Sequence, residues 1–164
     1  NEVEMGATIH SKTGGFEFQA LVGYETKEHQ GIVSMYLPDG DPQSGPGMLM
    51  IGSLFDQDVS LEQAIAVEIK SSPAYDFSEP QAIQIDGQEG AGLDFSTTYQ
   101  ALDGVILANP GASEGDTIRG KLILIMLNPR RQFKCVMLAP ERDWDKIYPR
   151  FEQVFSNLAF LEIP

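Results

Sequence analysis

Few side chains in this sequence are of the types that carry out acid, base or nucleophilic chemistry. The two histidines, His10 and His29, lie far apart, and neither has a second ligand at the spacing of a His-Glu-x-x-His motif. No Gly-x-Ser-x-Gly motif is present, so a nucleophilic serine would need partners from distant segments. The sequence therefore predicts no assembled catalytic site, no metal site and no cofactor.

Two glycine-rich segments resemble nucleotide-binding loops only in part. Residues 115–122 (GDTIRGKL) have the Gly and Lys spacing of a phosphate-binding loop, but Leu122 replaces the Ser or Thr that binds the metal. The segment also leads into a strand instead of a helix, whose amino terminus would bind the phosphates. Gly87, Gly90 and Gly92 stand in the reverse order of a dinucleotide-binding fingerprint, and we interpret them as backbone bends between strands.

Acidic residues occur as short alternating pairs, which are Asp39 with Asp41, Asp56 with Asp58, and Glu114 with Asp116. Alternate carboxylates on a loop can bind calcium, but a calcium site needs about six oxygen ligands, and none of these segments continues into a full calcium loop. Two carboxylates could also hydrolyse a glycosidic bond if they met in a cleft. We interpret the pairs as solvated turn residues.

Basic residues provide the clearest candidate for a binding surface. Arg142, Lys146 and Arg150 recur at every fourth residue of a predicted helix, on the face opposite its apolar residues. Arg130 and Arg131 lie nearby in sequence, in a predicted turn. These five residues are predicted to bind an acidic partner protein, and the alternative is an ordinary solvated surface.

The overall charge limits the partners of the chain. The net charge is −13, with 3 basic and 19 acidic residues in 1–118 but 8 basic and 5 acidic residues in 119–164. Such a chain would repel a phosphate backbone, which argues against binding to nucleic acid or to anionic membrane surfaces. No apolar run approaches the roughly 18 residues of a membrane helix, so we expect no membrane insertion by this domain.

The 164 residues fit one domain, 1–164, because domains usually have about 100 to 200 residues. Cys135 is the only cysteine, so no intramolecular disulfide can form. It alternates with Phe133 and Met137 in an apolar run and is predicted to be a buried, inert thiol.

Alternation of apolar and polar residues predicts several strands. Residues 91–101 alternate at a period of two, which predicts a strand with one wet face. Residues 121–127 and 133–139 are apolar on both faces, and the short connection between them requires an antiparallel hairpin. Further strands are predicted at 7–10, 16–22, 32–37, 48–55 and 81–86, with loops at 39–47 and 108–115.

Two segments are predicted to be helical. The first begins at Ser60, which forms a capping box with Gln63 and precedes an apolar stripe of Leu61, Ala64, Ile65 and Ile69. The second covers about 142–157, where Pro149 predicts a kink or a division. Because the middle strands are apolar on both faces, helices must cover both. We therefore predict an α+β fold, a three-layer α/β/α sandwich around a mainly antiparallel sheet.

Several short motifs resemble the PsbP-like superfamily over nearly the whole chain. These motifs are Gly15, Phe16 and Phe18, followed by Gly23 and Tyr24; the helix start at Ser60 and Leu61; the turn at Ile85, Asp86 and Gly87; and the run FSNLAF at 155–160. The superfamily includes the extrinsic PsbP subunit of photosystem II, a Ran-binding import factor and small bacterial envelope lipoproteins. The resemblance implies an α/β/α sandwich and a role in binding partners.

Together these features predict a non-enzymatic accessory or binding domain of a bacterial cell-envelope lipoprotein, with an unidentified protein partner. The resemblance and the acidic composition lead us to expect an extracytoplasmic location and a lipid tether in a segment upstream of Asn1. Because the first residue is Asn1 instead of Met, any export signal would already have been removed from this sequence. Two alternatives remain open. One is a calcium-linked photosystem II accessory protein, and the other is a small hydrolase that uses scattered carboxylates.

Overall fold

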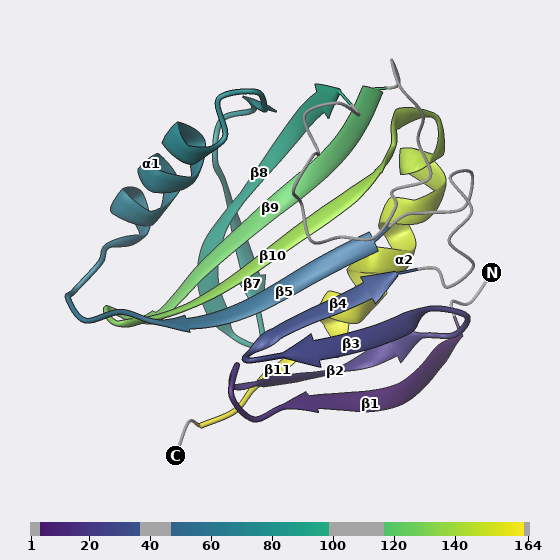
Figure 1. Cartoon of the computed structure of the whole chain (residues 1–164), viewed down its shortest axis with the longest axis horizontal. Helices are drawn as coiled ribbons and strands as arrows, with labels where there is room; N and C mark the ends of the chain where they lie inside the picture. Colours follow the sequence, from purple (N-terminus) through teal and green to yellow (C-terminus); the bar gives the residue numbers. More distant parts are fainter. Residues whose placement is uncertain (1–3, 37–46, 99–116, 163–164) are drawn as a thin grey trace.

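The computed structural model describes residues 4–36, 47–98 and 117–162. Its strands form two antiparallel sheets, accompanied by two helices (Figure 1). The elements are β1 (Met5–Ser11), β2 (Phe16–Leu21), β3 (Glu25–His29), β4 (Ile32–Tyr36), β5 (Gly47–Leu54), α1 (Leu61–Ser71), β6 (Asp76–Phe77), β7 (Gln81–Ile85), β8 (Gln88–Thr98), β9 (Thr117–Asn128), β10 (Arg131–Pro140), α2 (Trp144–Ser156) and β11 (Ala159–Phe160).

The larger sheet has eight strands in the order β3-β4-β5-β10-β9-β8-β6, and β7 pairs with β8 beside this path. The smaller sheet has three strands in the order β1-β2-β11. Every pairing among the described strands is antiparallel, which confirms the mainly antiparallel sheet expected from the sequence.

The hairpin of β9 and β10 forms the centre of the larger sheet, as predicted. Its register places Phe133 opposite Ile125. Because successive side chains of a strand point to opposite faces, Leu122 and Leu124 belong to one apolar core, whereas Ile123 and Ile125 belong to the other. These four β9 side chains are at most 3% exposed. The hairpin therefore needs cover on both faces.

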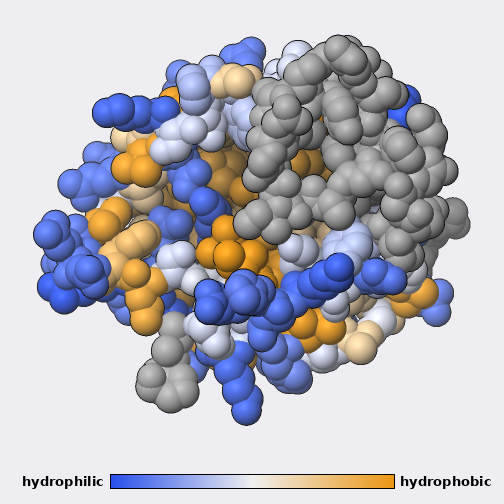
Figure 2. All heavy atoms as spheres, in the orientation of Figure 1, coloured by the Kyte–Doolittle hydropathy of each residue, from blue (hydrophilic) through white to orange (hydrophobic). Residues whose placement is uncertain are grey.

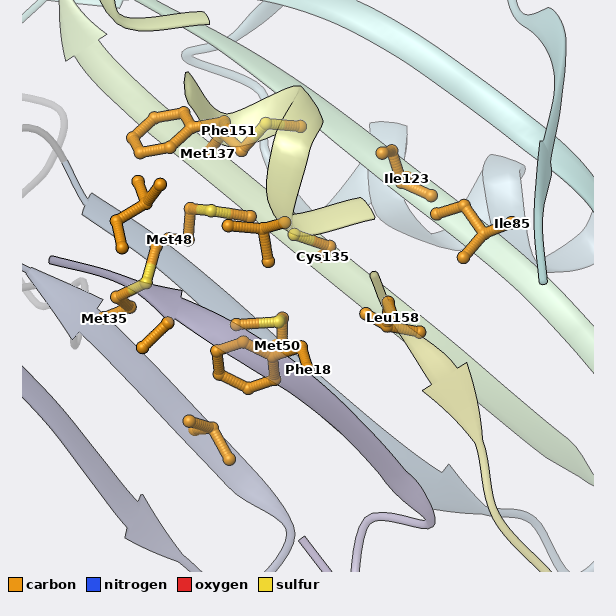
Figure 3. Close-up of a cluster of buried hydrophobic side chains, with 14 of the residues drawn as sticks. Phe18, Met35, Met48, Met50, Ile85, Ile123, Cys135, Met137, Phe151 and Leu158 are labelled. Carbon is orange, nitrogen blue, oxygen red and sulfur yellow. The ribbon is translucent and has the colours of Figure 1, made fainter. Parts of the chain in front are cut away.

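One face of the larger sheet is covered by α2 together with the smaller sheet. The core on this side contains Phe16 and Phe18 from β2, Phe151 from α2, and methionines of β4, β5 and β10 (Figure 3). Cys135 lies in the same core, fully buried, and burial raises the pKa of its thiol. The predicted burial of Cys135 is thus confirmed.

The other face of the larger sheet is covered in part by α1. The predicted capping box is present, because Ser60 Oγ accepts from the Gln63 amide and Gln63 Oε1 accepts from the Ser60 amide. Only Ala64 of this helix is fully buried, and Ile69, which the sequence placed in the apolar stripe, is 42% exposed. Val67 is also exposed, and apolar side chains interrupt the hydrophilic surface over α1 (Figure 2).

Helix α2 begins after a 3₁₀ turn (Glu141–Asp143) and continues through Pro149 as one element, so the predicted division does not occur. The two helices cover opposite faces of the larger sheet, as expected. The predicted three-layer α/β/α sandwich is met only in part, because α2 shares its face with a second sheet. No helix in the described residues is long and apolar enough to cross a membrane.

The sequence analysis missed three strands, and it extended the strands predicted at 16–22, 48–55 and 81–86 one residue beyond their observed ends. Strand β3 is mostly polar and exposed, while β6 and β11 have two residues each, so none carries a periodic apolar signal. The predicted loops at 39–47 and 108–115 fall almost entirely outside the described residues. Residue 37 of the predicted strand 32–37 and residues 99–101 of the predicted strand 91–101 also lie outside the described residues.

A close contact between backbones joins the two sheets. The turn between β1 and β2 lies on β5, where a Cβ atom at Gly52 would collide with the backbone of Gly14. The Gly52 amide also donates to the Gly31 carbonyl at 3.1 Å. A glycine is therefore required at position 52 because no side chain fits between the two backbones.

We predict that Gly52→Ala destabilises the chain by about 3 kcal/mol, since the backbone of Gly14 must shift to admit a methyl group. The matched control is Gly6→Ala in β1, where the nearest atom to an added Cβ is the Ala20 carbonyl oxygen at 3.4 Å. This control should be neutral or stabilising by about 0.5 kcal/mol, because alanine loses less entropy on folding. Urea unfolding of both variants measures the difference, and equal stabilities would contradict the contact.

Candidate functional site

The described residues form a groove of about 440 Å³ between α2 and the strands β7 and β9, which we call the α2 groove. Apolar side chains from the sheet and the helix alternate with polar ones around it. The lining residues are Ile83, Gln84, Ile85, Asp86, Lys121, Ile123, Tyr148, Glu152, Phe155 and Ser156. Pockets of this kind, apolar with a few convergent polar groups, are the usual binding sites of proteins.

Strand β8 lies between β7 and β9, and its Gly92 is next to two residues of the groove wall. Gly92 pairs with Ile123 of β9 on one side. A Cβ atom at Gly92 would lie 3.0 Å from Lys121 Cε and 3.1 Å from Ile83 Cγ2, so these two residues of the groove wall pack closely over the glycine. Figure 3 shows Ile85 and Ile123 on this side of the sheet, close to each other across β8.

The interpretation of three glycines as bends between strands is correct for Gly87 only. Asp86 and Gly87 have φ angles of 50° and 75° and form the two-residue turn between β7 and β8. Gly90 and Gly92 instead lie inside β8. The prediction of a wet face in this strand is wrong for most of its length, because on that face Gly90 and Gly92 are buried and Asp94 is half-buried.

The two ends of the groove differ in charge. At one end, Lys121 Nζ donates to Tyr148 Oη at 3.0 Å and lies 5.1 Å from the centre of the Tyr148 ring. At the other end, the carboxylate of Asp86 accepts from the Phe160 amide at 2.9 Å. Glu152 adds a second carboxylate from α2. The groove therefore has a cationic and an anionic end, joined by an apolar floor.

Two polar side chains of the groove form hydrogen bonds within the chain. The Lys121 amine is engaged by Tyr148, and the Ser156 hydroxyl donates to the Glu152 carbonyl at 3.2 Å instead of facing a base. Sequence analysis missed Lys121 as a site residue. The available signal was its place as the single charge in the predicted apolar strand 121–127, on the same side as Ile123.

Neither histidine lies in the groove. His10 pairs with Glu17 across β1 and β2, and its side chain is 59% exposed. His29 is exposed in β3, at the edge of the larger sheet. Both are thus surface imidazoles.

The acidic pairs are only partly described. The Asp58 carboxylate accepts from Arg130 Nε at 2.9 Å, and both side chains are more than half exposed. Asp39, Asp41, Glu114 and Asp116 lie outside the described residues. Within the described ranges, no group of three or more His, Cys, Asp or Glu residues is arranged to hold a metal ion.

The five predicted basic residues do not form one patch. Arg142, Lys146 and Arg150 are exposed at α2 and the turn before it, and Arg142 pairs with Asp143 at 3.8 Å. Arg130 and Arg131 lie at the opposite end of β10. The ten residues of this strand separate the two groups by roughly 30 Å.

Arg131 has a structural role that the sequence did not indicate. Its guanidinium donates to the carbonyls of Gly15 and Leu161, each at 2.7 Å, and so links the β9–β10 turn, the β1–β2 turn and the carboxyl-terminal segment. Burial lowers the pKa of this guanidinium. Arg131 thereby holds the smaller sheet against the larger one.

We predict that Arg131→Met destabilises the chain by about 1.5–3 kcal/mol, because two buried carbonyls lose a charged donor. The matched control is Arg130→Met, whose exposed ion pair with Asp58 should contribute at most about 1 kcal/mol. Thermal unfolding of both variants tests the assignment. A loss for Arg131→Met no larger than that for Arg130→Met would contradict it.

Comparison with known proteins shows similarity at the level of structure. No protein-family model and no curated protein sequence matches the chain. LpqN of Mycobacterium tuberculosis, a protein involved in cell envelope biogenesis, has a TM-score of 0.63 and 11% identity, over 99% of this chain and 93% of LpqN. The PsbP protein CyanoP of Synechocystis sp. PCC 6803 has a TM-score of 0.62 and 14% identity, over 98% of this chain and 94% of CyanoP.

Two further solved structures are similar. The Ran-binding protein Mog1p of Saccharomyces cerevisiae has a TM-score of 0.59 and 8% identity, over 98% of this chain and 97% of Mog1p. A Bacteroides thetaiotaomicron protein has a TM-score of 0.60 and 16% identity, and this chain spans 49% of its length. The chain therefore has the PsbP-like fold, as the sequence resemblance implied. None of these descriptions names an enzymatic activity.

Proposed function

We propose that this chain is a non-enzymatic binding domain that docks a protein partner. The observation that carries the proposal is the α2 groove, which combines an apolar floor with charges at both ends and engages its own amine and hydroxyl groups internally. Similar structures include a Ran-binding protein, which supports a binding role for the fold. The described residues provide no observation that favours calcium-linked function or hydrolysis over binding.

We further propose that the domain acts outside the cytoplasm, as part of a bacterial cell-envelope lipoprotein. The structural similarity to LpqN, which is involved in cell envelope biogenesis, supports this placement. The net charge of −13 is compatible with an exported domain that stays soluble and does not adhere to anionic surfaces. A lipid tether upstream of Asn1 would hold the domain at the membrane.

The basic residues of α2 are proposed as contacts to acidic groups of the partner. Lys146 and Arg150 each lie two residues from the groove-lining Tyr148, about 160° around α2, so they occupy a face that points away from the groove. Arg142 precedes α2, in the 3₁₀ turn. A partner seated in the groove would reach these residues only if it also extended around the helix. Arg130 and Arg131 lie at the far end of β10 and would contact only a partner that spans the sheet.

We predict that a photo-crosslinking amino acid at Ser156, in the groove, captures one discrete protein in the cells from which the gene comes. The matched control is the same amino acid at Glu28, which is exposed in β3 at the edge of the larger sheet. No adduct should form there. Absence of an adduct from Ser156, or equal adducts from both positions, would contradict the proposal.

Charge reversal tests the basic face. We predict that Arg142→Glu combined with Lys146→Glu reduces the yield of the Ser156 adduct about tenfold at low salt, because charges at the edge of an interface mainly accelerate association. The control combines Lys12→Glu and Lys70→Glu, two exposed positions far from α2 in sequence. An unchanged adduct yield with the α2 variant would remove the basic residues from the binding surface.

A further inference from the structure

Strand β7 has an unpaired edge. It pairs with β8 on one side, and within the described residues no strand pairs with its other side. The two-residue turn makes Ile85 and Gln88 a hydrogen-bonded pair, so alternate residues of β7 direct their backbone groups toward β8. The remaining residues, Ala82 and Gln84, direct their N–H and C=O groups outward. Both are exposed, so these backbone groups can pair with another strand.

The two edges of the larger sheet differ in composition. Strand β3, at the opposite edge, carries Glu25, Lys27 and Glu28, and charged side chains on an edge strand discourage pairing with other chains. Strand β7, with the sequence QAIQI, carries no charge. The charged edge at β3 therefore discourages pairing with another strand, whereas the uncharged edge at β7 permits it.

An added strand would direct side chains to the side of the α2 groove. Ile83 and Ile85 of β7 line the groove, and a neighbouring strand continues the same pleat, with every second side chain on that side. A cavity of about 150 Å³ accepts a benzene ring. The 440 Å³ of the groove therefore suits two or three apolar side chains.

The charges at the groove ends determine where such a strand can carry a cationic side chain. Asp86 and Glu152 lie where β7 and α2 end, and the carboxyl terminus of a helix is itself partly negative. A cationic side chain is favoured there. Lys121 disfavours a second cation at the other end, and the net charge of −13 attracts a basic segment to the molecule.

We propose that β7 binds an extended segment of the partner as an added strand. Its alternate apolar side chains enter the α2 groove, and a Lys or Arg lies at the end marked by Asp86 and Glu152. This inference rests on the proposed function and specifies the chemistry of the partner. Main-chain hydrogen bonds to Ala82 and Gln84 provide affinity, and the groove and its charges provide specificity.

The proposal is tested by mRNA display, in which a library of random ten-residue peptides is selected for binding to the intact chain. We expect the enriched peptides to share apolar residues at alternate positions and a basic residue at one end. Synthetic peptides from the selection should bind in fluorescence anisotropy. Enrichment of peptides with apolar residues at helical spacing, or no enrichment above a bait-free selection, would overturn the proposal.

Two variants separate the groove from the strand edge. Gly92→Val adds a side chain beneath Lys121 and Ile83, two residues of the groove wall, and displaces both of them. Ala82→Pro removes an outward N–H without removing a bond to β8, a position where edge strands accept proline. Each should weaken peptide binding at least tenfold, whereas the control Thr8→Val, at an exposed residue of β1, should not. Unchanged binding to Gly92→Val and Ala82→Pro would overturn the proposal.

N-methylated peptides test the same proposal with the unmodified chain, so the result does not depend on whether a variant folds. Methylation of the peptide amides that face β7 should abolish binding, whereas methylation of the intervening amides should not. Equal effects at all positions would exclude strand addition. If the Ser156 crosslink captures a partner but the peptides fail these tests, the protein-binding function stands and this mode of binding does not.

Discussion

The burial of apolar side chains on both faces of β9 and β10 is the constraint on which the rest of the structure depends. Ile123 and Ile125 face one core while Leu122 and Leu124 face the other, so neither side of the sheet can remain open to water. Covering one side requires α1, and covering the other requires α2 and the smaller sheet. At about 25 cal/mol per Å² of apolar surface, this burial is the main favourable contribution to folding.

The α2 groove lies beside this doubly covered centre. Next to the central hairpin, Ile83 and Lys121 pack over Gly92 of β8 and form part of the groove wall. Helix α2 packs against the strands beyond this point through Phe151 and Val154, and it does not fill the groove. The fold thus combines a buried core with a groove that is bordered by β7, a strand paired on one side only among the described residues.

The sequence predicted features that depend on local patterns and missed those that depend on distant contacts. The central hairpin follows from continuous apolar runs with a short connection, and the helix start at Ser60 follows from its capping box. The structural role of Arg131 could not be predicted, because the carbonyls that accept its hydrogen bonds, those of Gly15 and Leu161, are 116 and 30 residues away in sequence. The groove was missed for the same reason, since it joins β7, β9 and α2.

Residue-resolved hydrogen exchange of the free chain tests the central claim most directly. The account predicts that the amides of Leu122 to Ile125 exchange only through global unfolding, since both of their faces are covered. The outward amides of Ala82 and Gln84, in contrast, should exchange orders of magnitude faster, at the rate of exposed backbone. Rapid exchange in the β9 centre, or protection of Ala82 and Gln84 equal to that of the core, would contradict a doubly covered hairpin with an open strand beside it.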